Sequence, residues 1–128
     1  MYRKYLRLFF VFVFFVSCSK SVKPVTSFSN PKDIYEEGLK LISEKEYSHA
    51  LEYFQYIIDN HKDDEKYFNW ALYEIGFIYY LKGDDEKAVG YFNEVLRVSK
   101  IKAPRILASL VKDKIEKGNG YKNSYYRD

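Results

Sequence analysis

The chain has 128 residues, a length that is enough for one small folded domain but not for several. Of these residues 47% are hydrophobic and 30% are charged. Its formal charge of +3 comes from the N-terminus, because residues 1–17 hold three basic groups and no acid. The rest of the chain balances 18 Lys and Arg against 18 Asp and Glu, so charge gives no argument for a nucleic-acid partner, and we expect none.

Residues 1–17 have the pattern of an export signal peptide. Arg3, Lys4 and Arg7 precede an unbroken apolar run over residues 8–16. As a helix this run would be roughly 14 Å long at ~1.5 Å per residue, about half the thickness of the hydrocarbon core. The run is too short to span a membrane, and we expect it to be removed with the leader.

Cys18 is the only cysteine and follows Val16 and Ser17 directly. This arrangement resembles a lipobox, in which a diacylglycerol group is attached to the cysteine sulfur and the leader is cut just ahead of it. The lipobox prefers Leu where this chain has Phe15. Lipidation of Cys18 would account for both the number and the position of the cysteine, and it implies an acyl lipid as the only attached group. The alternative is a free thiol left after ordinary secretion.

Residues 19–30 are polar, rich in serine and without an apolar period. Together with the lipidated Cys18 they predict a flexible tether over residues 18–30.

A helical pattern begins after the tether. Asn30 is suited to be an N-cap, with Pro31 at the first helical position. A break at residues 44–46 separates this helix from a second one, in which apolar residues recur at spacings of three and four. The stripe of the second helix consists of Ala50, Leu51, Phe54, Ile57 and Ile58.

The same pattern recurs 38 residues later. The recurrence predicts two stacked units, over residues 31–62 and 67–100. Four extra residues at 63–66 are assigned to the loop between the units, which brings the underlying period to 34. The repeated pairs include Gly38 and Gly76, Leu41 and Tyr79, Ala50 and Ala88, Tyr53 and Tyr91, and Phe54 and Phe92.

A third amphipathic segment covers residues 104–117 and ends at Gly118. We expect its apolar face to cover the exposed end of the stack as a capping helix. The following residues, 119–128, have no clear period and predict a loose tail. The apolar face of the expected capping helix consists of Ile106, Leu107, Leu110, Val111 and Ile115.

The second unit resembles a tetratricopeptide repeat, with Trp70, Leu72, Gly76 and Tyr79 in its first helix and Ala88 and Phe92 in its second. The resemblance implies an all-α fold: a right-handed stack of two helical hairpins and a C-terminal capping helix, about five helices in total. The residues expected to pack the repeats are Gly38, Ala50, Phe54, Gly76, Tyr79, Ala88 and Phe92.

Residues 31–42 and 47–54, placed after a lipobox and a short tether, resemble the N-terminal part of the BamD-like outer-membrane assembly lipoproteins. The resemblance implies a lipid-anchored protein on the periplasmic side of the outer membrane, accessory to the β-barrel assembly (Bam) complex. Its partners would be a BamA-like barrel-assembly subunit, unfolded outer-membrane protein substrates, or both. The alternatives are a pilotin-like factor or another repeat scaffold of the cell envelope, and a small ligand-binding or enzymatic lipoprotein.

In repeat proteins of this kind the first helix of each hairpin lines a concave groove. An aromatic groove suits an extended or partly folded chain with apolar anchors. The alternative is that these side chains pack only against neighbouring helices or under the tether. The residues expected to line the groove are Tyr35, Leu39 and Ile42 in the first unit and Trp70, Tyr73, Phe77 and Tyr80 in the second.

Other candidate sites carry little chemistry. His49 and His61 lack the spacing of metal ligands, and the acidic residues at 63–65 and 84–86 lack the alternation and central glycine of a calcium loop. Both acidic groups precede helices, where acids suit the positive end of the helix dipole. Residues 118–120 form no phosphate loop. We therefore predict no metal site, no catalytic set and no enzymatic activity.

Overall fold

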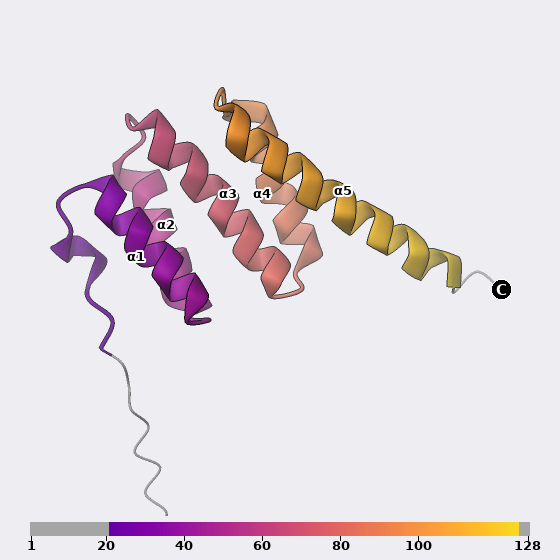
Figure 1. The fold of residues 1–128 in the computed structure, drawn as a ribbon, viewed down its shortest axis with the longest axis horizontal. Helices are drawn as coiled ribbons and strands as arrows, with labels where there is room; N and C mark the ends of the chain where they lie inside the picture. Colours follow the sequence, from indigo (N-terminus) through magenta and orange to yellow (C-terminus); the bar gives the residue numbers. More distant parts are fainter. Residues whose placement is uncertain (1–20, 126–128) are drawn as a thin grey trace, which may run out of the picture.

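The computed structural model describes residues 21–125, with side chains to residue 118. The predicted leader and the predicted lipidation site, Cys18, lie outside this part. The described backbone contains helices and no strands (Figure 1). A short 3-10 turn, η1 (Val25–Ser27), precedes five α-helices: α1 (Pro31–Ser43), α2 (Tyr47–Asn60), α3 (Glu65–Leu81), α4 (Asp85–Val98) and α5 (Lys102–Tyr125).

The helices form two rows. α1 pairs with α2 and α3 pairs with α4, and each hairpin packs on the next helix along the chain. α1 also contacts α3, and α3 contacts α5, so these three form one row, which we call the inner row. α2 and α4 form the outer row, behind the inner row in Figure 1. This arrangement confirms the predicted all-α fold, similar to a tetratricopeptide-repeat stack.

Each hairpin closes on a contact between a glycine and a phenylalanine ring. A Cβ placed on Gly38 would lie 2.7 Å from Phe54 Cζ, and one on Gly76 would lie 2.8 Å from Phe92 Cε1. Real Cβ atoms essentially never lie closer than 3.0 Å to such neighbours, so any other residue at these two positions would force the ring or the helices to shift. Of the residues predicted to pack the repeats, Ala50, Ala88, Phe54 and Phe92 are fully buried, and the Tyr79 ring is stacked 5.7 Å from that of Tyr91.

The two hairpins also turn in the same way. In the second turn, Gly83 N–H donates to the Tyr80 carbonyl and Asp84 N–H donates to the Tyr79 carbonyl. The first turn repeats both bonds 38 residues earlier. This is the Schellman pattern, which needs a left-handed residue after the helix. Gly83 supplies it with φ of 76°, whereas the first turn places Lys45 there with φ of 63°.

Three helices begin at side-chain caps. The side chain of Asn30 accepts a hydrogen bond from Asp33 N–H at 2.9 Å, which confirms the predicted cap of α1. Asp64 caps α3 and Asp84 caps α4 by accepting from the backbone N–H three residues on. The acidic residues ahead of these helices therefore satisfy free N–H groups and suit the helix dipole, as expected.

The prediction that residues 63–66 lie in the loop is correct for Asp63 and Asp64 and wrong for Glu65 and Lys66, which belong to α3. α3 begins at Glu65 and has 17 residues, whereas α1 has 13. The four additional residues therefore add about one turn to the N-terminal end of α3. Asp64 sets this start, because its carboxylate caps the helix four residues before the position that corresponds to Asn30 of α1.

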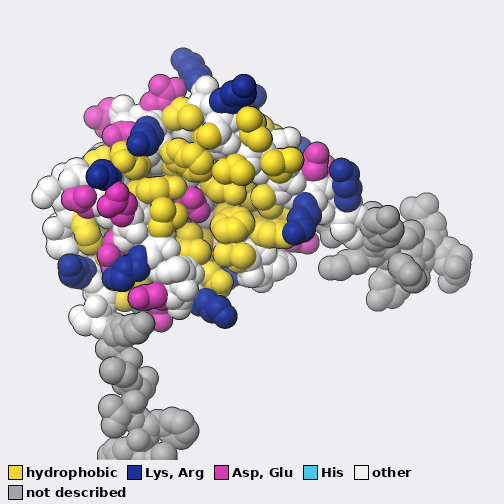
Figure 2. Space-filling model, viewed as in Figure 1, with side chains coloured by type: hydrophobic (Ala, Val, Ile, Leu, Met, Phe, Trp, Pro, Cys, Tyr) yellow, Lys and Arg dark blue, Asp and Glu magenta, His cyan; other side chains and the backbone are white. Residues whose placement is uncertain are grey.

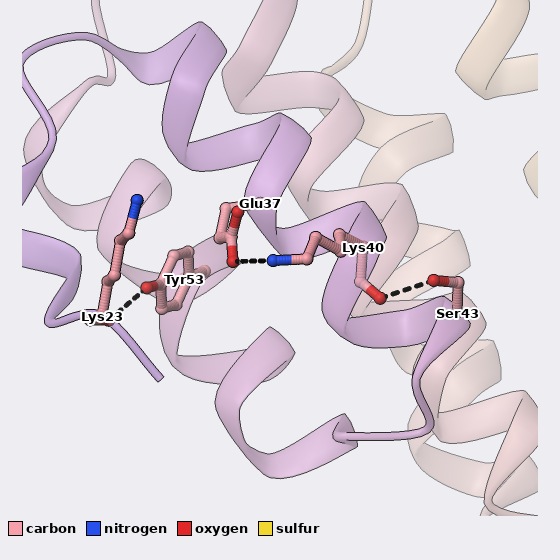
Figure 3. A network of polar contacts seen from close by, with 5 residues as sticks. All are labelled: Lys23, Glu37, Lys40, Ser43 and Tyr53. Carbon is pink, nitrogen blue, oxygen red and sulfur yellow. Dashed lines mark hydrogen bonds and ion pairs between the residues drawn. The ribbon is translucent and has the colours of Figure 1, made fainter. Parts of the chain in front are cut away.

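The predicted tether is folded over much of its length. Val25 is buried, and Val22 and Phe28 pack beside it on the core shared by α1 and α2. The Tyr53 hydroxyl donates to the Lys23 carbonyl (Figure 3). The Phe28 ring also meets the Tyr53 ring edge-on at 5.7 Å. We call residues 22–28 the N-terminal strap. Three apolar side chains spaced three apart explain why this segment docks.

The α1 helix next to the strap has its own polar contacts. Lys40 Nζ lies 2.8 Å from Glu37 Oε1, and the Ser43 hydroxyl donates to the Lys40 carbonyl at 2.6 Å (Figure 3). These contacts lie on exposed side chains, so they add little to the free energy of folding. They lie within α1, so the strap is joined to the first hairpin by its apolar side chains and by the hydrogen bond from Tyr53 to Lys23.

The last helix differs from its prediction in length and in face. α5 continues through Gly118 to Tyr125, so Gly118 does not end the helix and residues 119–125 are not loose. The side chains of α5 that pack on the stack include Ala108 and Ile115, which are buried, and Val111 beside them. Ile106, Leu107 and Leu110 are exposed. The predicted stripe was too wide for one helix to bury against one hairpin.

The two turns give a direct test of the left-handed backbone. We expect Lys45→Gly to stabilise the protein by about 0.5–1 kcal/mol, because a side chain in the left-handed region is strained. The measurement is urea unfolding of the full chain in a non-ionic detergent.

Gly83→Lys is the matched control, since it places lysine in the second turn, where an added Cβ meets no atom within 4 Å. It should destabilise the protein by a similar amount. An unchanged or lower stability of Lys45→Gly would show that the first turn carries no strain.

Candidate partner-binding face

The large apolar side chains that the described structure leaves exposed come from one row of helices. They are Leu39 on α1, Leu81 on α3, and Ile106, Leu107 and Leu110 on α5. None comes from α2 or α4, whose large apolar side chains are all buried or half-buried. Figure 2, seen from the side of the inner row, shows a broad apolar surface with charged side chains mainly around its edge. We call this surface the apolar face.

The aromatic residues of α3 form a ladder of rings. The Trp70 ring meets the Tyr73 ring at 5.8 Å, Tyr73 stacks on Phe77 at 6.0 Å, and Phe77 meets Tyr80 at 6.1 Å. Trp70, Phe77 and Tyr80 are half-buried. By helical period Trp70, Phe77 and Leu81 share one side of α3, so they extend the apolar face along this helix.

Tyr73 belongs to the core and not to the exposed groove. Its ring lies 5.8 Å from that of Phe92 on α4, and only 7% of the residue is exposed. Burial raises the pKa of Tyr73 to about 12, and the nearby Glu74 carboxylate adds to the effect. The ladder is also held by α5, where Lys114 Nζ lies 5.7 Å from the centre of the Tyr80 ring. Of the four residues of α3 expected to line the groove, Tyr73 is therefore part of the core, and the other three are half-buried.

On α1 the three expected groove residues have different surroundings. Leu39 is exposed, and Ile42 is half-buried beside the first core. Tyr35 is wedged between the repeats, with its ring 5.6 Å from that of Phe54 and 5.5 Å from that of Tyr67. Of these three side chains, Leu39 is the one placed to meet a partner.

A buried carboxyl group lies between the two repeats, and sequence analysis did not single it out. Glu74 on α3 is 7% exposed and accepts a hydrogen bond from the Tyr35 hydroxyl at 2.9 Å. Burial raises the pKa of Glu74 to about 7, and the Tyr35 hydrogen bond opposes part of that rise. Burial and the Glu74 charge also raise the pKa of Tyr35. The one available signal was an acid within the apolar run of residues 70–81.

The remaining sequence candidates are not brought together. His49 lies near the start of α2, 3.6 Å from Glu46, and His61 follows the end of the same helix. Within the residues that the structure describes, no group of three or more His, Cys, Asp or Glu side chains could hold a metal ion. No helix between residues 21 and 125 has the length and hydropathy to cross a membrane.

Comparison of the chain with protein-family models, curated proteins and solved structures finds no match in any of the three. The function must therefore be inferred from the fold and the surface of the chain.

Glu74 predicts a pH dependence of stability. Its folded pKa of about 7 lies above the ordinary value of 4.5, so between these values the folded protein binds more protons than the unfolded protein. Stability should therefore fall as the pH rises from 5 to 7.5, by on the order of 2–3 kcal/mol. Glu74→Gln should remove this fall, because the amide stays neutral and still accepts from Tyr35.

The measurement is the urea midpoint of each variant at several pH values. Glu36→Gln is the matched control, because Glu36 occupies the same repeat position on α1 but is exposed. It should keep the pH profile of the unchanged protein. A Glu74→Gln profile that still falls with pH in the same way would contradict an uncharged, buried Glu74.

Proposed function

We propose that this protein is a lipid-anchored adaptor of the cell envelope that binds other proteins through its apolar face. The observation that carries the proposal is the gathering of the exposed large apolar side chains on the inner row alone. Continuous exposed apolar surface of this kind marks interaction sites in soluble domains. A domain with no further role would gain by placing polar residues at Leu39 and Leu81.

The shape and chemistry of the face suit a segment with apolar anchors. The rings of Trp70, Phe77 and Tyr80 offer rigid, half-exposed surfaces, and Leu39 and Leu81 extend them. Aromatic and aliphatic side chains on a partner would lose water against these surfaces at little cost in side-chain entropy. An extended chain or an amphipathic helix fits such a surface better than a compact polar ligand does.

The proposed anchor is an acyl lipid on Cys18. Two residues lie between Cys18 and Ser21, where the described structure begins, and the three steps along the chain span at most about 11 Å at ~3.6 Å each. The strap then joins the first hairpin, so a lipid on Cys18 would hold α1 and α2 close to the bilayer. Stable anchoring takes two or more acyl chains, which diacylglycerol supplies.

Within this general role we propose the β-barrel assembly machine of the outer membrane as the setting, with the protein on the periplasmic side. The support is the resemblance of residues 31–42 and 47–54 to BamD-like lipoproteins and the position of Cys18 ahead of them. The apolar face would receive a BamA-like subunit or an unfolded barrel substrate, whose strands carry exposed apolar side chains. A pilotin-like or scaffold role predicts different partners for the same face.

Site-specific photocrosslinking in cells tests the proposal. A benzophenone amino acid is placed in the full chain at Leu39 or at Leu81, and at Gln55 as the control, because Gln55 is exposed on the outer row. We expect adducts with the large barrel-assembly subunit or with unfolded outer-membrane proteins from Leu39 and Leu81, and few from Gln55. Leu39→Ser combined with Leu81→Ser should lower capture at least about tenfold, since each buried leucine contributes roughly 1.5–3 kcal/mol.

Adducts with a secretin would favour the pilotin-like role and overturn the assembly role. Equal adducts from all three positions would overturn the apolar face as the binding surface. Cys18→Ser separates the anchor from the partner, because it should release the protein from the membrane fraction without changing the face.

A further inference from the structure

α5, at the end of the stack, leaves exposed a helix position that is covered on α1 and on α3. Ala71 and Ile78 of α3 are fully buried in the core shared with the first hairpin. Ala108 and Ile115 of α5, 37 residues later, are buried in the same way against the second hairpin. α5 therefore sits on α4 in the register in which α3 sits on α2.

This register shows which side of each inner helix faces the next one. Tyr35 of α1 is covered by Tyr67 and Glu74 of α3. Tyr73, at the same position of α3, is buried in the core that α3, α4 and α5 share, and it is 7% exposed. The corresponding residue of α5 is Leu110, and it is 60% exposed. Ile106, one turn earlier, is 47% exposed.

The charges beside this patch are mainly positive. Residues 102–118 of α5 hold five Lys and Arg and two Asp and Glu. Three of the five cations have contacts: Arg105 donates to the Leu96 and Ser99 carbonyls, Lys112 lies 3.6 Å from Glu116, and Lys114 lies over Tyr80. In the described part of the chain no carboxylate pairs with Lys102 or Lys117, which lie one turn before Ile106 and two turns after Leu110.

We propose that the α5 end patch, formed by Ile106 and Leu110 between Lys102 and Lys117, docks an acidic amphipathic helix of a partner protein. A helix is the occupant because helices cover the equivalent position at both earlier places in this stack. Acidic flanks complement the two unpaired lysines. A second copy of α5 would bring like charges together, and the three exposed apolar residues of α5, Ile106, Leu107 and Leu110, give too little apolar width for a helix to lie in a bilayer.

The α5 end patch is one end of the apolar face, so this inference rests on the proposed function. Leu39 and Leu81 carry the test of that function, whereas Leu110 and Lys117 carry this one. The two proposals can therefore fail independently.

The test uses two synthetic 18-residue helical peptides with the same leucine stripe, one flanked by glutamates and one by lysines. Each is labelled with fluorescein and titrated with the full chain in a non-ionic detergent, and anisotropy reports binding. We expect the glutamate peptide to bind at least tenfold tighter than the lysine peptide. Leu110→Ser should weaken its binding about tenfold, and Lys117→Glu should weaken it and reduce its dependence on salt.

Gln55→Ser is the control, because it changes an exposed residue of the outer row, outside the apolar face, and should leave peptide binding unchanged. Circular dichroism checks that each variant keeps its helices. Equal binding of the two peptides, or equal binding by Leu110→Ser, would overturn the proposal. So would dimers in sedimentation that Leu110→Ser abolishes, or binding to phosphatidylglycerol vesicles that requires Leu110.

Discussion

The contact of a glycine with a phenylalanine ring sets the spacing of both hairpins. Gly38 lies against Phe54 and Gly76 against Phe92, at distances that exclude even one additional carbon atom. The close crossing lets each ring fill the space between two helices, so Phe54 and Phe92 are completely buried. Because the same contact occurs in both units, the two hairpins have similar shapes, and the second can stack on the first. Tyr35 then reaches Glu74 across the junction.

The stacking also determines which apolar side chains remain exposed. Each outer helix packs against the inner helices on two sides and presents polar residues outward, whereas each inner helix has a further side that no part of the described chain covers. The aromatic ladder of α3 lies along that side and is partly held by Phe92 and Lys114. At the α5 end the repeat stops with Leu110 uncovered. One packing rule therefore accounts for both proposed binding surfaces.

The hairpins could be predicted from the sequence because their determinants are local and recur. The glycine and phenylalanine pairs, the Asn30 cap and the turn at Gly83 all follow from residue type and spacing. Three features could not be predicted in this way. The extra turn of α3 depends on which acid caps it, docking of the strap depends on the shape of the first core, and the choice among the apolar residues of α5 depends on the width of the surface that α4 offers. The buried state of Glu74 depends on how α1 and α3 meet.

A double-mutant cycle on Gly76 and Phe92 tests the central contact most directly. Gly76→Ala should destabilise the protein by about 1–3 kcal/mol, because the added methyl group overlaps the ring and the Tyr91 Cβ at 3.1 Å. Phe92→Leu removes the ring edge, so in that background Gly76→Ala should cost at least about 1 kcal/mol less. Gly90→Ala is the control, since a Cβ there meets no atom within 4 Å, and it should stabilise α4 by about 0.5–1 kcal/mol. Additive effects of Gly76→Ala and Phe92→Leu, measured by urea unfolding, would contradict the glycine–phenylalanine contact as the basis of the fold.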